Sequence, residues 1–204
     1  MSISERKHRE KAFIKEQIVN AATELFSLYG YEHVSMRKIA DKIEYSPTTI
    51  YNYFKNKNEL LFELLKQGYE LFYQTLDSTY QTNKKEHFDL KFKSILSAYI
   101  EFGLSHKDYY KLMFISNIDK DDSLMGVENE RAKAFEILIS LVREGTESNY
   151  FIHPDERLIS QMIWGQLHGI TSLLITYKDF PWVQHESLID HYLESVIKGV
   201  KNGG

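Results

Sequence analysis

Residues 46–57, SPTTIYNYFKNK, carry the side chains with the most recognisable chemistry in this chain. Hydroxyl, amide and ammonium groups crowd this short stretch more densely than solubility requires. These groups bind the phosphates and the base edges of duplex DNA. The alternative is a tight helical unit whose tyrosines and threonines are ordinary surface side chains. The residues that we predict to contact DNA are Arg37, Thr48, Thr49, Tyr51, Asn52, Tyr53 and Lys57.

Each of these side chains suits one kind of DNA contact. Tyr51, Tyr53 and Lys57 suit phosphate, and Lys57 falls in the first turn of a predicted helix, where backbone amides also attract an anion. Arg37 can reach a guanine edge or a phosphate. The side chains suited to base edges or thymine methyl groups are Thr48, Thr49 and Asn52.

Local signals indicate which elements hold this stretch in place. Apolar residues at spacings of three and four predict a first helix over 9–29, and Gly30 follows it where a left-handed cap is favoured. Ser35 is placed as the N-cap of a second helix over 36–43. This second helix would support the segment that carries the hydroxyl groups.

The third predicted helix is the one that would face DNA. Ser46 and the proline after it predict a helix over 47–54, because proline lacks a donor that would be unsatisfied at the first helical position. Asn56 and Glu59 form a capping-box pattern that begins a long fourth helix over 57–82. Two short helices joined by a tight turn are typical of a helix-turn-helix, whose second helix enters the major groove.

The remainder of the chain also has a helical pattern. Proline occurs only three times, and the alternation typical of strands is hard to find. We expect a polar connection over 117–123. The further helices that we predict span 86–105, 107–117, 123–148, 155–178 and 184–201. The prediction is an all-α fold of about nine helices.

Composition excludes several classes of protein. The chain has no cysteine, which excludes disulfides, thiolate metal sites and cysteine nucleophiles. No apolar run approaches the roughly 18 residues of a membrane span, and no signal peptide is apparent, so we expect a cytoplasmic protein without a membrane partner. Residues 1–60 hold ten Lys/Arg and eight Asp/Glu, whereas the remainder holds fifteen and twenty-one. A mildly basic N-terminal part is consistent with DNA contact.

Patterns for metal and enzyme chemistry are weak. His185 and His191 are six residues apart, too far for one helix face. A di-iron bundle needs two Glu-x-x-His pairs, and the one pair here, Glu5 with His8, lies in a charged tail. Neither a Gly-rich phosphate loop nor a Gly-x-Ser-x-Gly elbow is present. We predict no metal, no cofactor and no enzymatic activity.

Residues 9–60 resemble the N-terminal domain of the TetR family of bacterial transcriptional regulators. The residues that carry the resemblance are Ala21, Leu25, Phe26, Gly30, Ser35, Ile39, Ala40, Ser46, Thr49, Ile50, Tyr51, Tyr53, Phe54, Lys57 and Leu60. The resemblance implies a homodimer with a helix-turn-helix DNA-binding domain over 1–56 and a helical ligand-binding and dimerisation domain over 57–204. Members are usually repressors that a small molecule releases from a palindromic operator. The alternative is a small-molecule-binding or adaptor protein that kept this fold without operator binding.

One residue departs from the family pattern. The family usually has glycine in the turn between the two short helices, where this chain has Glu44. If Glu44 is left-handed, its side chain costs roughly 1 kcal/mol of stability. The substitution also places an acid near the expected DNA.

The C-terminal part carries a second, shorter resemblance. Residues 164–169, WGQLHG, resemble the Trp-His-Gly subgroup of the same family, and residues 109–114, YYKLMF, do so more loosely. Trp164 and His168 are four apart and therefore share a helix face. His168 suits either a core histidine bonded to a backbone carbonyl or a contact with the ligand.

Aromatic and methionine side chains of the middle helices predict a pocket for a small apolar or aromatic effector. An aromatic stripe at helical spacing is also the pattern of plain core. The predicted ligand-binding residues are Tyr99, Phe102, Tyr110, Met113, Phe114, Phe135, Trp164 and His168, with Met162 nearby.

The last two helices are expected to pair with their copies in a second protomer. Gly165 and Gly169 are four apart, and small residues at that spacing let another helix approach closely. The final helix has an apolar stripe for such an interface, although it could bury that stripe against its own domain. The predicted interface residues are Gly165, Gly169, Leu173, Tyr192 and Val196.

Overall fold

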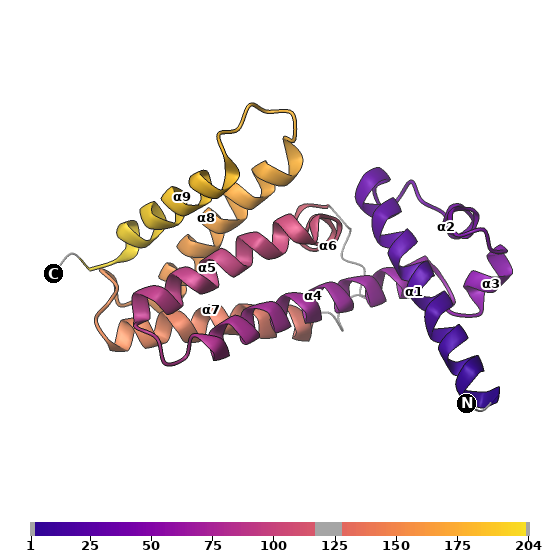
Figure 1. The fold of residues 1–204 in the computed structure, drawn as a ribbon, viewed down its shortest axis with the longest axis horizontal. Coiled ribbons are helices and arrows are strands. Elements are labelled where there is room, and N and C mark those ends of the chain that lie inside the picture. Colours follow the sequence, from indigo (N-terminus) through magenta and orange to yellow (C-terminus); the bar gives the residue numbers. More distant parts are fainter. Residues whose placement is uncertain (1–2, 117–127, 203–204) are drawn as a thin grey trace. The chain divides into compact units, whose positions relative to one another are not determined.

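The computed structural model describes residues 3–116 and 128–202 (Figure 1). Within those residues the chain forms nine α-helices and one π-helical turn, and its β-structure is a single isolated bridge between Phe151 and Lys201. The predicted all-α fold is therefore confirmed. No helix in the described residues is long and apolar enough to cross a membrane.

The helices gather into two compact units that interleave along the sequence. The head unit comprises Met1–Gly68 and Asp108–Glu128, and the body unit comprises Tyr69–Lys107 and Asn129–Gly204. Helix α4, Lys57–Thr82, begins in the head unit and ends in the body unit.

The head unit is built on three N-terminal helices and the first turns of α4. They are α1 (Ile3–Tyr29), α2 (Met36–Lys42) and α3 (Pro47–Tyr51). Apolar side chains from all four helices meet in one core with no exposed surface: Ile18, Ala22, Phe26, Ile39, Ile50 and Leu60. Helix α1 begins six residues before the predicted start, and α3 ends at Tyr51 rather than at residue 54.

The predicted helix caps are present in the head unit. Gly30 ends α1 with a φ of 81°, and its N–H donates to the carbonyl of Phe26 at 2.9 Å. The side chain of Ser35 accepts from the backbone of α2, and that of Ser46 accepts from the N–H of Thr49 at 3.2 Å. These caps satisfy amides that a helix start leaves without an intrahelical partner.

The predicted helix over 107–117 is interrupted. Residues Lys107–Tyr110 form α6, and Lys111–Ile115 form a π-helical turn, η1. Asp108 accepts a hydrogen bond from the Ser27 hydroxyl of α1 at 2.6 Å. A side chain at Gly68 would meet the Met113 sulfur at 2.8 Å and the Tyr109 ring at 2.9 Å, so glycine lets α4 and η1 pack closely. Residue 117 and the polar connection over 117–123 lie outside the described residues.

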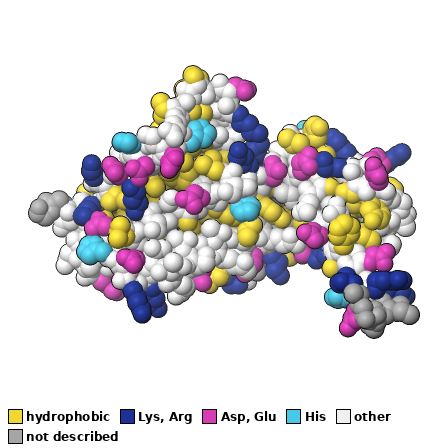
Figure 2. Space-filling model, viewed as in Figure 1, with side chains coloured by type: hydrophobic (Ala, Val, Ile, Leu, Met, Phe, Trp, Pro, Cys, Tyr) yellow, Lys and Arg dark blue, Asp and Glu magenta, His cyan; other side chains and the backbone are white. Residues whose placement is uncertain are grey.

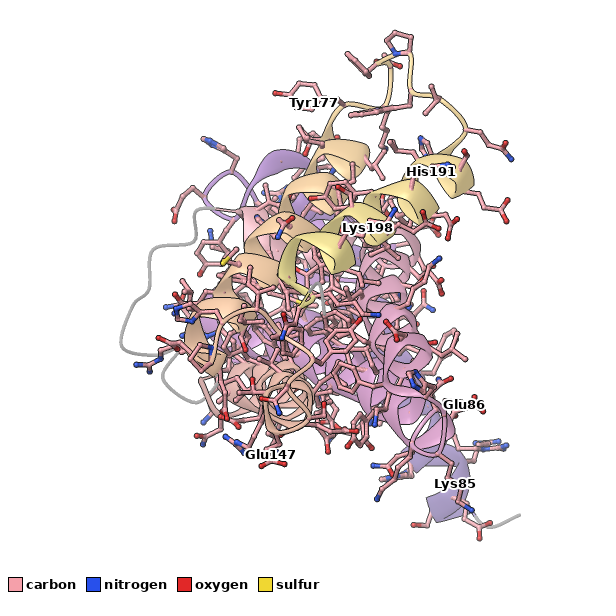
Figure 3. The ribbon with its side chains drawn as sticks, turned by 90° about the vertical axis from the view of Figure 1, so that its left-hand side faces the viewer. Lys85, Glu86, Glu147, Tyr177, His191 and Lys198 are labelled. Atoms are coloured by element: carbon pink, nitrogen blue, oxygen red, sulfur yellow. The ribbon has the colours of Figure 1, made fainter. Side chains whose placement is uncertain are left out.

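The body unit combines the second part of α4 with four further helices. These are α5 (Phe88–Ser105), α7 (Glu128–Glu147), α8 (Glu156–Thr176) and α9 (His185–Val200). Helices α5, α8 and α9 pack against one another, as Figures 1 and 3 show. Its core includes Phe92, Leu96, Ile100, Leu141, Ile163 and Leu167. The part of the predicted helix over 123–148 that precedes Glu128 lies outside the described residues.

A buried ion pair joins α5 to α7 in the body unit. The ammonium of Lys91 bonds to the carboxylate of Glu144, and the side chain of Lys91 is only 4% exposed. The ammonium also lies 5.6 Å from the ring centroid of Tyr80, which stabilises the cation further. A buried charge of this kind is tolerated because it is paired.

The C-terminal end is tied to the start of α5 by hydrogen bonds. Asp89 accepts from the Tyr150 hydroxyl at 2.7 Å and from the Lys201 ammonium at 2.8 Å. These two bonds lower the pKa of Asp89, and burial together with the same carboxylate raises the pKa of Tyr150. Protonation removes the negative charge of Asp89, so the tie weakens as the pH falls through the lowered pKa of Asp89.

Candidate nucleic-acid interface

Helix α3 presents one face to the core and the other to solvent. Ile50 is fully buried and Phe54 is 3% exposed, so these two side chains anchor α3 to the head unit. On the opposite face Thr48 and Asn52 are exposed, and Tyr51 is 54% exposed. Thr49 is half-buried and its hydroxyl lies 2.9 Å from that of Ser46. The arrangement leaves polar side chains on the solvent-facing surface of α3.

The predicted phosphate-binding side chains differ in how firmly they are held. Arg37 is exposed at the start of α2. Burial, with a smaller contribution from the Glu10 carboxylate, raises the pKa of Tyr53, whose side chain is half-buried. Lys57 donates to the carbonyl of Tyr31 at 2.9 Å and lies 4.0 Å from that ring's centroid.

The contact between Lys57 and Tyr31 was not apparent in the sequence pattern. The Tyr31 hydroxyl also bonds to Asn58, so the tyrosine is held against the first turn of α4. The interaction with Tyr31 orients the Lys57 ammonium at the start of α4. The pairing joins residues 26 apart, which helix periodicity cannot reveal.

Glu44 lies in the turn between α2 and α3. Its φ is 60°, in the left-handed region, and its side chain is exposed. The N–H of Tyr45 donates to the carbonyl of Ala40 at 3.0 Å and closes the turn. The backbone therefore adopts the conformation for which glycine is best suited, and the chain accepts the strain of a larger residue.

The predicted ligand-binding residues are divided between the two units. Tyr99, Phe102 and Tyr110 are at most 5% exposed and belong to the core. Tyr110, Met113 and Phe114 lie in the head unit, and the Tyr110 and Phe114 rings are 4.9 Å apart. The others lie in the body unit.

A second group of predicted ligand residues comes together on the body unit. The Trp164 ring lies 6.1 Å from that of Phe135 and 6.0 Å from that of His168. Burial lowers the pKa of His168, and its ring lies 3.2 Å from the Ser172 hydroxyl. Trp164 is 40% exposed, so this group lies at the surface of its unit rather than in the core.

Two open hollows flank α7 in the body unit. One, of about 760 Å³, is lined by Phe135 and Ile139 and by the start of α8 around Arg157. The other, of about 800 Å³, lies between α4 and α7 and is lined by Tyr73, Tyr80 and further polar residues. Both volumes are in the range of small-molecule sites, and both hollows mix apolar with charged side chains. In the described residues no group of three or more His, Asp or Glu could hold a metal.

The predicted dimer residues lie on different surfaces. Gly165, Gly169 and Leu173 share one face of α8, and a side chain built at either glycine would meet nothing within 4 Å. Tyr192 is half-buried and donates to the carbonyl of Gln166 at 2.8 Å. Val196 is 1% exposed, so it packs in the body unit's own core and is not available at a surface.

Comparison with known proteins identifies the family to which this chain belongs. Residues 18–64 match the family model described as bacterial regulatory proteins, tetR family. Residues 92–198, more than half of the chain, match the model described as tetracyclin repressor-like, C-terminal domain. The chain therefore belongs to the TetR family of DNA-binding, helix-turn-helix transcriptional regulators, and it is not an enzyme.

Individual relatives extend this similarity over most of the chain. The fatty acid metabolism regulator protein of Bacillus subtilis (strain 168) is 28% identical over 192 residues, which cover 91% of this chain and 95% of that protein. The structure of the fatty acid degradation regulator FadR from Bacillus halodurans aligns with a TM-score of 0.73 at 23% identity, covering 90% of this chain and 94% of that one. The ketosteroid transcriptional regulator KstR2 of Mycobacterium tuberculosis aligns with a TM-score of 0.74 at 16% identity, covering 92% and 95%. These two structures share the fold.

We predict that Glu44→Gly raises the free energy of unfolding by up to about 1 kcal/mol, because glycine adopts a left-handed turn without steric strain. Urea unfolding at neutral pH measures this change. Glu44→Ala is the matched control, since it removes the same charge but keeps the strained backbone, and it should not stabilise. Equal effects of the two substitutions would show that charge, rather than backbone strain, governs this position.

Proposed function

We propose that this protein is a ligand-responsive repressor that binds a palindromic operator as a homodimer. Residues 1–56 would read DNA, and residues 57–204 would bind the effector and form the dimer. The observation that carries the proposal is the solvent-facing surface of α3, whose polar side chains stand opposite the buried Ile50 and Phe54. Because an operator lies on the chromosome, we assign the protein to the cytoplasm.

The dimer is supported by an apolar strip on α8. Leu158, Met162 and Leu173 are 41%, 44% and 45% exposed, and they share a helix face with Gly165 and Gly169. Large apolar side chains on one exposed face favour burial against a partner. The two glycines between them leave room for a second helix to approach closely. A two-fold dimer also matches the symmetry of a palindromic site.

We infer that the effector is a small apolar molecule of the fatty-acid class and that the protein controls genes of fatty-acid metabolism. The similarity over 192 residues to a protein named as a fatty acid metabolism regulator supports this class. On the body unit, Phe135 lines the hollow of about 760 Å³ and contacts Trp164, which neighbours His168. Assignment of 164–169 to the Trp-His-Gly subgroup stays a prediction.

Helix α4 is the element that we expect to carry the response. It runs without a break from Lys57 to Thr82 and belongs to both units. A ligand can shift the protein toward the released state only by the difference in its affinity for the two states. We therefore expect the effector to bind more tightly to protein that is off the operator.

The first test concerns operator binding. Arg37→Gln combined with Tyr51→Phe removes two exposed phosphate donors, and it should weaken binding to the protein's own upstream DNA about tenfold or more, with a shallower salt dependence. Fluorescence anisotropy across a salt series measures both. Lys84→Gln, which removes an exposed charge in the body unit, should bind like wild type. Wild-type protein that binds no DNA would favour the adaptor alternative.

The second test concerns the dimer. Gly165→Glu with Gly169→Glu should leave the fold intact, because both positions face open space and glycine is a poor helix former. The added carboxylates would face their copies across the two-fold axis, so the protein should sediment as a monomer. Lys84→Glu with Lys85→Glu is the matched control, because both positions are exposed and lie between α4 and α5, outside the last two helices. A double variant that remains dimeric would place the interface elsewhere.

The third test concerns the effector. Palmitate should release operator DNA from the wild-type protein, whereas 2-naphthoate, an aromatic acid of equal charge, should do so poorly. Phe135→Ala should raise the palmitate concentration needed by about tenfold, because the variant lacks one aromatic side chain that packs on an apolar ligand. Anisotropy of labelled operator reports the release. Stronger release by naphthoate would indicate an aromatic effector instead.

A further inference from the structure

The first turns of α1 extend beyond the core of the head unit. Helix α1 begins at Ile3, yet the first buried side chain is Ile18, and every side chain over residues 4–13 is exposed. We call residues 4–13 the α1 extension; at 1.5 Å per residue it is about 15 Å long. A helix this short is marginal in isolation, so it persists as a continuation of the packed part of α1.

The α1 extension carries an excess of basic side chains. It holds Arg6, Lys7, Arg9 and Lys11 against Glu5 and Glu10. Figure 2 shows Lys and Arg side chains gathered around the start of the chain. Lys7, Lys11 and Lys15 are spaced four apart, so they form one row along the helix.

Lys15, at the packed end of that row, shows which part of the head unit lies beside the α1 extension. Lys15 donates to Glu63 of α4 at 2.7 Å, and its ammonium lies 5.8 Å from the ring centroid of Phe54. Lys15 thus points toward the residues that follow α3. Lys11 and Lys7 continue the same row one and two turns further, beyond the packed core. The influence of Glu10 on Tyr53 agrees with this placement.

We propose that Lys7 and Lys11 bind phosphates of duplex DNA beside the segment that α3 contacts, so that the α1 extension is a second phosphate-binding site. The match to the family's DNA-binding model begins at residue 18, so this site lies outside it. The row continues from Lys15, which lies against Phe54 just after α3, and it is on the same helix as Glu10, which influences Tyr53. Duplex phosphates carry a dense negative charge that such a row of ammonium groups can neutralise. The inference rests on the proposed operator binding.

The test compares a double variant, in which Lys7→Gln and Lys11→Gln are made together, with the wild-type full chain. Glutamine keeps the helix propensity of lysine, so circular dichroism should be unchanged. Binding to upstream DNA should weaken about tenfold or more, and the slope of log K against log salt should fall by about 0.9 for each phosphate that the variant no longer neutralises. Hydroxyl-radical footprinting should show weaker protection beside the α3 contacts of each half-site, with protection at those contacts retained.

The matched control is Lys84→Gln with Lys85→Gln, which removes two exposed charges from the turn between α4 and α5 (Figure 3). It should keep the wild-type slope and footprint. Suppose that the wild-type protein binds DNA but the Lys7 and Lys11 variant has the same salt slope and the same footprint as this control. The second phosphate site is then overturned while operator binding stands. If the wild-type protein binds no duplex at all, the proposed function falls and the inference falls with it.

Discussion

The anchoring of α3 is the constraint on which its exposed polar surface depends. A helix of five residues has too few internal hydrogen bonds to be stable alone. It exists because Ser46 caps its start and because Ile50 and Phe54 are buried under it. Those contacts leave no freedom to rotate, so the side chains on the other face are fixed toward solvent. Preorganisation of this kind lowers the entropic cost of binding.

Elements set by local signals could be predicted from the sequence. Ser35, Ser46 and Gly30 act on backbone groups within four residues of themselves, and their helix ends lie where the pattern placed them. The start of α1 at Ile3 could not be located in this way. Its first turns have no apolar stripe, and their helicity follows from the packed segment beyond them.

The candidate sites show the same division between local and distant causes. The exposure of Tyr51 follows from its position opposite Ile50 on a short helix. By contrast, spacing alone could not separate core aromatics such as Tyr99 from half-exposed ones such as Phe135. That difference depends on which helices pack together. Spacing also could not show that Val196 packs in the core of the body unit rather than at a dimer interface.

The pair formed by Lys91 and Glu144 restricts how this chain can change over evolutionary time. Lys91 is almost completely shielded, while Glu144 keeps 40% of its side chain exposed. Loss of the lysine leaves an acid that water can still solvate, whereas loss of the acid leaves a shielded cation without its carboxylate partner. Substitutions at position 91 should therefore precede those at position 144 in any lineage that abandons the pair. Descendants with an apolar residue at 91 and an acid at 144 would be the intermediates.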